Sequence, residues 1–199
     1  MCPPAPLTSA QDRRLRHREE ARCAILDAAQ ELLVEQGYES FSMRKLATRC
    51  GYAAPTIYHY FGDKPGLLDS LIELRVREVS AEMRAVRLAR DPVENMRRLF
   101  IAFARWGLAN PTHYQLLTST REPHPAGEEA REVLMRPVTQ LAEQGRLETD
   151  IELARQSFWA LVHGIISLQT TRPEEGWSEQ LIERALDAMI SGLVKSEPS

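Results

Sequence analysis

Side chains that donate hydrogen bonds or carry positive charge are grouped between Ser42 and Lys64. This segment holds two hydroxyls, Ser42 and Thr56, the phenol of Tyr58, and cations that include Arg44 and Lys64. Donors and cations of this kind bind the phosphates of an anionic polymer such as DNA. Arginine can also pair with a guanine edge, which discriminates by about 1–3 kcal/mol. The segment has the chemistry of nucleic-acid recognition, provided that the fold places these side chains on one surface.

Patterns for catalysis or metal binding are sparse in the same sequence. There is no His-Glu-x-x-His pair, no glycine-rich phosphate loop, no Gly-x-Ser-x-Gly elbow and no Cys-x-x-Cys pair. The five histidines are scattered, at His17, His59, His113, His124 and His163. We therefore expect no metal, no cofactor and no enzymatic activity. A helical enzyme with residues assembled from distant positions, or an interaction module that does not bind DNA, is the alternative.

The spacing of apolar residues predicts helices around these donors and cations. Apolar residues recur at intervals of three and four from Ala21 to Leu33, which indicates an amphipathic helix that Gly37 would end. A short helix should follow Ser42 and stop at Gly51, and another should start near Pro55. Such short helices are not stable alone and must pack on the first one. This order of elements is typical of a helix-turn-helix unit.

The rest of the chain is predicted to be helical too. A long helix should run from Asp63 to about Leu88, and shorter ones should start near Pro92, Pro111, Ala130, Thr149 and Ser178, with a kink or break at Pro137. No strand and no internal repeat is predicted. The expected fold class is all-α, with a three-helix helix-turn-helix unit, a following helical bundle and about nine helices in total.

The segment from Ser42 to Leu68 resembles the DNA-binding signature of the TetR (tetracycline-repressor-like) family of transcriptional regulators. With the helix that ends at Gly37, the resemblance covers about residues 20–68. The matching residues are Leu46, Ala47, Gly51, Thr56, Tyr58, Phe61, Lys64, Leu67 and Leu68. Further along, the segment from Trp159 to Gly164 is similar to the Trp-His-Gly signature of one group of TetR-like C-terminal domains.

This resemblance implies a role for each polar residue of the segment. Ser42, Tyr58 and Lys64 are expected to bind phosphates, with Thr56 close to the groove. Arg44 occupies a position that can reach a base edge. The roles place DNA contacts on the starts of two helices and on the helix between them.

The third helix is expected to enter the DNA groove. Its small apolar positions, Ala53, Ala54 and Pro55, can touch a thymine methyl but cannot read hydrogen-bonding patterns. His59 and Tyr60 should therefore make most of its polar contacts. Ala53 also stands where the family often has a serine or threonine cap, and Pro65 and Gly66 should soften the first turn of the next helix.

The overall charge adds little to this interpretation. The chain of 199 residues has a formal net charge of -3, whereas residues 1–65 hold nine basic and eight acidic side chains. A protein that coats nucleic acid through global charge is excluded. DNA binding must come from local placement of cations and should be sensitive to salt.

The last two helices are predicted to form a dimer interface. The helix that holds Trp159 is apolar nearly all round, which suggests burial on two sides, and the last helix carries a stripe of small residues. TetR-like proteins typically pair through two such helices, although an internal helical hairpin would show the same pattern. The expected interface residues are Trp159, Ile166, Leu181, Ala185, Ala188 and Gly192.

A set of aromatic residues could line a ligand pocket between the helices. An ordinary core would look the same in sequence, and His163 would then be a hydrogen-bonded structural residue. The expected ligand-binding residues are Phe100, Phe103, Trp106, Tyr114, Phe158 and His163. The ligand should be a small apolar effector, and the resemblance implies a repressor that it releases from a palindromic operator of double-stranded DNA.

The expected organisation is a flexible basic arm over 1–17, a helix-turn-helix DNA-binding domain over 18–65 and a ligand-sensing and dimerisation domain over 66–199. No stretch reaches the roughly 20 apolar residues of a membrane span. The start of the chain has no apolar signal core. We therefore expect a cytoplasmic protein with no membrane partner.

Overall fold

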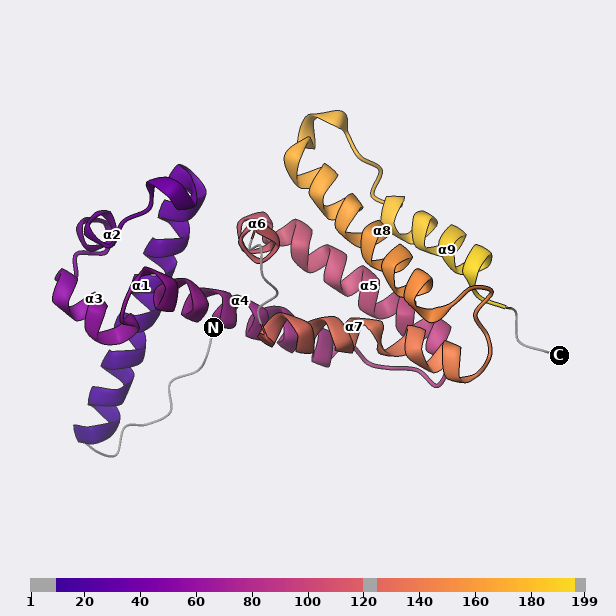
Figure 1. The fold of residues 1–199 in the computed structure, drawn as a ribbon, viewed down its shortest axis with the longest axis horizontal. Helices are drawn as coiled ribbons and strands as arrows, with labels where there is room; N and C mark the ends of the chain where they lie inside the picture. The colour runs from indigo at the N-terminus through magenta and orange to yellow at the C-terminus, as the bar shows by residue number, and fades with distance from the viewer. Residues whose placement is uncertain (1–9, 120–124, 196–199) are drawn as a thin grey trace. The chain divides into compact units, whose positions relative to one another are not determined.

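The computed structural model describes residues 10–119 and 125–195, which fold almost entirely into helices (Figure 1). These ranges contain nine α-helices and one short 3-10 turn, so the predicted all-α class and helix number are confirmed. No strand forms in them, and a single isolated bridge joins Leu147 to Val194. The chain divides into two compact units, residues 1–72 and 73–199, which are described separately.

The first unit contains α1 (Ala10–Ser40), α2 (Met43–Cys50), α3 (Ala54–Phe61) and the start of α4 (Lys64–Ala85). Helix α4 runs across the division of the chain. The unit packs around Ile25, Leu46 and Ile57, which are completely buried and come from α1, α2 and α3. The two eight-residue helices therefore rest on the longer α1, as their length requires.

Helix α1 differs from expectation at one end and agrees with it at the other. It begins at Ala10, so residues 10–17 are helical and not a flexible arm, while residues 1–9 lie outside the described part. At its far end the backbone leaves the helix at Gly37, whose φ of 74° belongs to the left-handed region. The predicted stop at Gly37 is confirmed.

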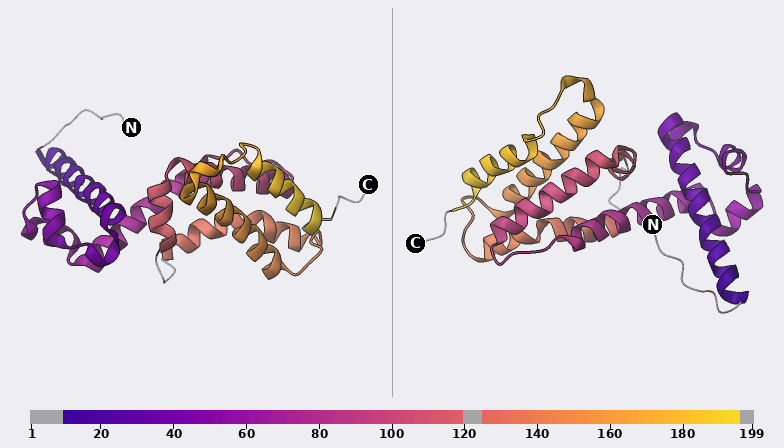
Figure 2. Two further views of the ribbon diagram at one scale, coloured as in Figure 1. Left: turned by 90° about the horizontal axis from the view of Figure 1, so that it is seen from above. Right: turned by 180° about the vertical axis from the view of Figure 1, so that it is seen from behind.

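The second unit is built around one central helix. Helix α5 packs against α6, α7, α8 and α9, and Figure 2 shows these helices from two further sides. The rings of Phe100 and Phe158 lie 5.7 Å apart in its core, both fully buried. The elements after α4 are α5 (Pro92–Ala109), α6 (Pro111–Ser119), α7 (Pro125–Glu143), α8 (Ile151–Thr171), η1 (Pro173–Glu175) and α9 (Leu181–Leu193).

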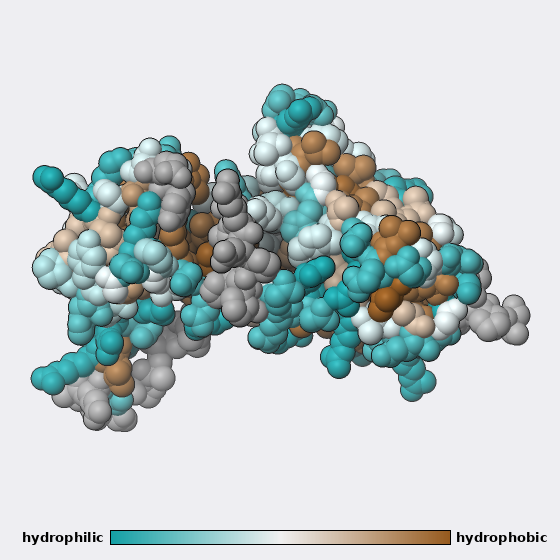
Figure 3. Space-filling model, viewed as in Figure 1, coloured by the Kyte–Doolittle hydropathy of each residue, from teal (hydrophilic) through white to brown (hydrophobic). Residues whose placement is uncertain are grey.

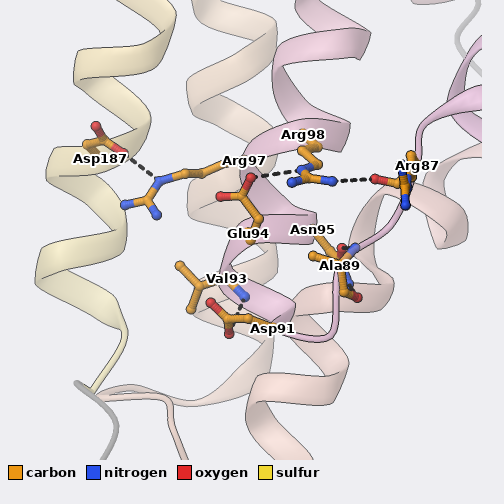
Figure 4. A network of polar contacts seen from close by, with 9 residues as sticks. All are labelled: Arg87, Ala89, Asp91, Val93, Glu94, Asn95, Arg97, Arg98 and Asp187. Atoms are coloured by element: carbon orange, nitrogen blue, oxygen red, sulfur yellow. Dashed lines mark hydrogen bonds and ion pairs between the residues drawn. The ribbon is translucent and has the colours of Figure 1, made fainter.

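Polar contacts hold the start of α5 and the connection that leads into it (Figure 4). Asp91 caps the helix by accepting from the N–H of Val93 at 3.1 Å. The buried Asn95 pairs with both main-chain groups of Ala89, at 2.6 and 3.1 Å. Arg97 of α5 donates to Asp187 of α9 at 2.7 Å. The connection is thus fastened to the helix that organises the core.

The end of the described chain is tied back to the turn between α7 and α8. The N–H of Glu148 donates to the carbonyl of Leu193 at 2.9 Å, and the N–H of Lys195 donates to the carbonyl of Arg146 at 2.8 Å. These bonds flank the bridge between Leu147 and Val194. They hold the last turn of α9 in place.

Several local predictions in this unit were wrong. The cap of α8 is Asp150, which accepts from the N–H of Leu153 at 2.9 Å, and not Thr149. Helix α9 begins at Leu181, three residues after the predicted cap Ser178. Helix α7 begins at Pro125 and not near Ala130. It continues through Pro137 without the break that was one of the two predicted outcomes there, because packing of its apolar face outweighs one lost backbone hydrogen bond.

Candidate nucleic-acid interface

The interface begins where α2 starts. The Oγ atom of Ser42 accepts from the N–H of Lys45 at 3.3 Å, so Ser42 is the N-cap of α2. A capping hydroxyl keeps its own proton for a second partner. Ser42 can therefore cap the helix and still donate to an external oxygen.

The cations of α2 have different surroundings. The ammonium of Lys45 donates at 2.8 Å to both the Gln36 side chain and the Ser40 carbonyl. Arg49 binds Glu35 at 2.5 Å and Glu31 at 3.4 Å, both on α1. Arg44 is exposed, and its guanidinium forms no hydrogen bond or ion pair within the described part of the chain. Arg44 is thus the α2 cation that remains available to DNA.

The pair between Arg49 and Glu35 also affects the charge of both groups. The hydrogen bond from Arg49 holds the pKa of the Glu35 carboxyl below its usual range, and the same bond raises the pKa of Arg49. Both groups stay ionised around neutral pH. Because both are exposed to solvent, the pair orients α2 on α1 more than it stabilises the unit.

Helix α3 presents several predicted contact residues at its surface. Ala53 and Pro55 are exposed, Ala54 and Thr56 are half-buried, and Ala53 caps α3 with no side-chain bond, as predicted. Tyr58 is 49% exposed, and its hydroxyl has no hydrogen-bond partner in the described residues. It can therefore donate its proton to an incoming phosphate.

His59 and Tyr60, which were expected to make most polar contacts of α3, differ in exposure. His59 is exposed, whereas Tyr60 is half-buried. The guanidinium of Arg18 lies 5.9 Å from the ring centre of Tyr60. The ring centres of His59 and Tyr60 are also 5.9 Å apart, in an edge-to-face arrangement. One face of Tyr60 is thus occupied within the chain, and His59 is the more accessible of the two.

A tight turn joins α3 to α4 and places Lys64. Asp63 accepts from the N–H of Gly66 at 2.9 Å, which confirms the predicted start of α4. A Cβ atom at Gly66 would lie 2.3 Å from the carbonyl oxygen of Phe61. The glycine is therefore required by close packing at this turn. Lys64 is half-buried and donates to the carbonyl of Phe41 at 3.1 Å.

The predicted ligand-binding set does not line one cavity. Phe100 and Phe158 are fully buried core residues, because their helices turn these positions towards the centre of the bundle. Trp106 borders an open groove of about 660 Å³ between α4 and α5, which otherwise includes charged side chains such as Arg97, Arg98 and Glu94. This groove is more polar than the predicted pocket.

The remaining members of the set do form a cluster. The ring of Phe103 lies 6.3 Å from that of Trp106 and 5.5 Å from that of His163. His163 lies 4.0 Å from Trp159 by ring centres, and its Nδ1 is 2.7 Å from the hydroxyl of Tyr114. These residues come from α5, α6 and α8. We call Phe103, Trp106, Tyr114, Trp159 and His163 the aromatic cluster.

Burial changes the titration of the two polar members of the aromatic cluster. It lowers the pKa of His163 to about 4 and raises the pKa of Tyr114 to about 12. Both groups are therefore neutral near pH 7. The Nε2 atom of His163 is buried and has no hydrogen-bond partner within the described ranges. A buried ring nitrogen without a partner is costly, which makes it a place where a further polar atom would be favourable.

The predicted dimer residues also lie in different surroundings. Ile166 is completely buried and packs against Gly107 in its own unit, so its predicted place in an interface was wrong. Trp159, Leu181 and Ala185 are half-buried, whereas Ala188 and Gly192 are exposed. Figure 3 shows apolar surface over α8 and α9. Two leucines of α8, Leu153 and Leu168, are exposed.

Sequence reasoning missed the residues that support the interface. Lys45 and Arg49 fasten α2 to α1, and Arg18 and Arg22 lie over the rings of Tyr60 and Phe61. Their partners are too distant in sequence to be recognised by spacing alone. No described helix is long and apolar enough to cross a membrane, and the same residues contain no metal-binding group of His, Cys, Asp and Glu side chains.

Two short helices joined by a glycine turn, resting on α1 and exposing Arg44 and Tyr58, define a helix-turn-helix protein. The family described as "Bacterial regulatory proteins, tetR family" matches residues 25–71, and the one described as "Tetracyclin repressor-like, C-terminal domain" matches residues 96–193. The chain belongs to the TetR family and is a DNA-binding transcriptional regulator.

Similar proteins agree with this assignment over most of the chain. The transcriptional regulator UidR of Escherichia coli is 25% identical over 198 residues, which cover 88% of this chain and 94% of UidR. The transcriptional repressor AcnR of Corynebacterium efficiens is 28% identical over 169 residues, 81% of this chain and 88% of AcnR. These relatives are regulators and not enzymes, as expected. A TetR family regulator from Marinobacter aquaeolei shares the fold with a TM-score of 0.75 at 20% identity, covering 91% of this chain and 100% of that one.

Proposed function

We propose that this regulator is a dimeric repressor that binds a palindromic operator and leaves it when a small molecule binds the second unit. The exposure of Arg44 and Tyr58 carries the DNA part of the proposal. Both are accessible on the helix-turn-helix, while the neighbouring cations of α2 are held by α1. A base-reading arginine and a phosphate-binding phenol are thus presented on adjacent helices.

Dimer formation is supported by the surface of the last two helices. Leu153 and Leu168 are 50% and 43% exposed on α8, and the small residues Ala188 and Gly192 are exposed on α9. Exposed apolar side chains on α8, together with small residues on α9, which packs against it, permit close packing of helices against a second copy. A two-fold dimer would carry two copies of α3 and favour an operator with two-fold symmetry.

Repression and effector release have separate support. The relative AcnR is named a repressor. In the second unit, the aromatic cluster surrounds the unpartnered Nε2 of His163, so an aromatic ligand with one polar atom would both stack and form a hydrogen bond. Since His163 is neutral, the polar atom of the ligand would face an uncharged ring nitrogen. Release requires that the ligand favour a conformation that binds DNA less well, typically by about 1–3 kcal/mol of coupling.

Selection of binding sites from random DNA, followed by footprinting, tests the DNA part. Two symmetric half-sites should be protected, with centres about 34–36 Å apart or at a multiple of that distance. Protection of one asymmetric half-site would contradict the proposal. Arg44→Ala should relax the base preference at one position in each half-site, whereas Lys45→Ala should leave the selected sequence unchanged.

A thermal-shift screen of small aromatic compounds, followed by a DNA-release assay, tests the effector part. Trp106→Ala should impair release by a compound found in this way and leave DNA affinity without the compound nearly intact. Trp177→Ala removes a tryptophan outside the aromatic cluster and is the matched control. A normal response of the Trp106 variant would show that the aromatic cluster is only core.

A further inference from the structure

Residues 12–20 of α1 are helical although none of them is buried within the chain. All residues from Asp12 to Glu20 are exposed, and Ala21 is the first buried residue of the helix. Most helices in proteins are stabilised by packing an apolar face, and isolated short helical segments are marginal. Packing within the unit does not explain the composition of this extension, which we call the α1 extension (residues 12–20).

Arginines form a stripe along one side of the α1 extension and continue into the packed helix. Arg14, Arg18 and Arg22 are spaced by four residues and therefore share one face. The guanidinium of Arg18 lies 5.9 Å from the ring centre of Tyr60, and that of Arg22 lies 5.7 Å from the ring centre of Phe61. Both rings belong to α3. The stripe thus runs along the side of α1 on which α3 lies, and Arg14 extends the stripe by one turn.

Acidic side chains lie away from this stripe. At about 100° per residue, Asp12, Glu19 and Glu20 are displaced by roughly 100–160° from Arg18 around the helix. The Glu20 carboxylate pairs with Arg16 at 3.7 Å and lies 3.4 Å from the ring nitrogen Nδ1 of His17. Arg14 has no ion pair within the described part of the chain. The charge of the stripe is therefore not neutralised by its own helix.

We propose that Arg14 and Arg18 form a second DNA-binding element that holds the phosphate backbone beside the groove entered by α3. Guanidinium groups bind phosphate oxygens through two parallel hydrogen bonds. Duplex DNA carries one charge per about 1.7 Å of its axis, so a stripe with charges about 6 Å apart along a helix meets several phosphates. The stacking of Arg18 on Tyr60 orients the first cation before DNA arrives.

This element enlarges the footprint of the proposed DNA-binding function, on which the inference rests. It adds affinity that does not depend on sequence, because phosphate contacts carry no base information. It also gives the arginine stripe of the α1 extension a binding partner. The weak positive balance of residues 1–65 is then sufficient, since the acidic residues of the α1 extension lie on other faces of the helix than the stripe.

The test measures the affinity of the full chain for a mixed-sequence DNA duplex over a range of salt concentrations. Removing two phosphate contacts in Arg14→Ala/Arg18→Ala should reduce the slope of log K against log salt by about 1.8 and weaken binding about 60-fold at 0.1 M salt. Arg13→Ala/Arg16→Ala removes two arginines from other faces of the same turns and is the matched control. Its slope should change by less than about 0.5.

Arg14→Ala alone guards against a loss of folding in the double variant, because Arg14 is exposed and forms no hydrogen bond or ion pair in the described chain. It should lower the slope by about 0.9 with an unchanged melting temperature. An unchanged slope for the Arg14 and Arg18 variants, or an equal loss in the control pair, would overturn the inference while leaving the proposed function intact. If the unmodified protein does not bind the duplex at all, the proposed function fails, and the inference fails with it.

Discussion

The ammonium of Lys64 donates to the main-chain carbonyl of Phe41 at 3.1 Å and lies 5.6 Å from the centre of the Phe41 ring. Phe41 directly precedes Ser42, the cap of α2. The first residue of α4 thereby holds the residue that leads into α2. The contact between Lys64 and Phe41 therefore links Lys64 to Ser42, and both residues are predicted to bind phosphates. An ammonium group has three donors, so it can bind Phe41 and a phosphate together.

Replacing Lys64 by alanine is expected to weaken binding to every DNA sequence. The salt dependence should fall by about one unit of slope, because one phosphate contact is lost. Salt titrations with specific and mixed-sequence duplexes measure both effects. Lys45→Ala, which removes a lysine tied only to α1 and its end, is the control and should keep the full slope. A Lys64 variant with an unchanged slope would remove Lys64 from the DNA contacts.

Replacing Gly66 by alanine is expected to disturb the turn between α3 and α4. The new Cβ would lie 2.3 Å from the carbonyl oxygen of Phe61, so the backbone must shift. We expect a loss of about 1–3 kcal/mol in the free energy of unfolding of the first unit, together with weaker DNA binding. Gly127→Ala, at a site where a Cβ meets nothing, is the control for denaturant unfolding. Equal stabilities of the two variants would show that the turn relaxes without cost.

Arginine at Ala188 or Gly192 is expected to separate the dimer into monomers. Both positions are exposed on α9, and an unpaired charge in a packed helix interface is strongly unfavourable. Sedimentation velocity measures the change in mass. Ala81→Arg, at an exposed position of α4, should sediment as the unmodified protein does. Dimers that survive both α9 changes would place the interface elsewhere.

Acidification is expected to destabilise the second unit through His163. Its pKa is about 4 in the folded protein, against an ordinary value of 6.5, so the unfolded chain binds the proton more readily between these values. The contribution of neutral His163 to the free energy of unfolding is therefore fully present above pH 6.5 and is lost as the pH falls towards 4. Between pH 7 and pH 5 this histidine should contribute a loss of about 2 kcal/mol.

Urea unfolding followed by tryptophan fluorescence measures this effect, because all three tryptophans belong to the second unit. The variant His163→Gln retains a polar side chain without the titration, and its stability should depend less on pH by the same amount. Parallel pH profiles for the two proteins would show that His163 is not the responsible group.

Local signals predicted the helix-turn-helix well, because its helix ends depend on residues that are close in sequence. The Ser42 cap, the stop at Gly37 and the Asp63 cap all follow from single residues and their immediate neighbours. The first turns of α1 were misread, because charged side chains without apolar spacing look the same in a helix and in a flexible arm.

Which cation faces DNA could not be predicted in the same way. Arg44 and Arg49 are both exposed positions on a short helix, and only the placement of Glu31 and Glu35 on α1 separates them. The aromatic residues show a similar limit. Apolar spacing turned Phe100 and Phe103 inward on the same helix, but the depth of each depends on the helices packed around it, so one became core and the other joined the aromatic cluster.

The hydrogen bonds from Glu148 to Leu193 and from Lys195 to Arg146 bear on how the protein can be tagged. A reporter or affinity tag joined directly after Leu193 would replace Val194 and Lys195 and remove the hydrogen bond from Lys195 to Arg146. The last turn of α9 would then fray. A junction placed after Lys195 keeps both bonds. Fusion proteins made to report effector binding should therefore retain the chain through Lys195 and begin their linker beyond it.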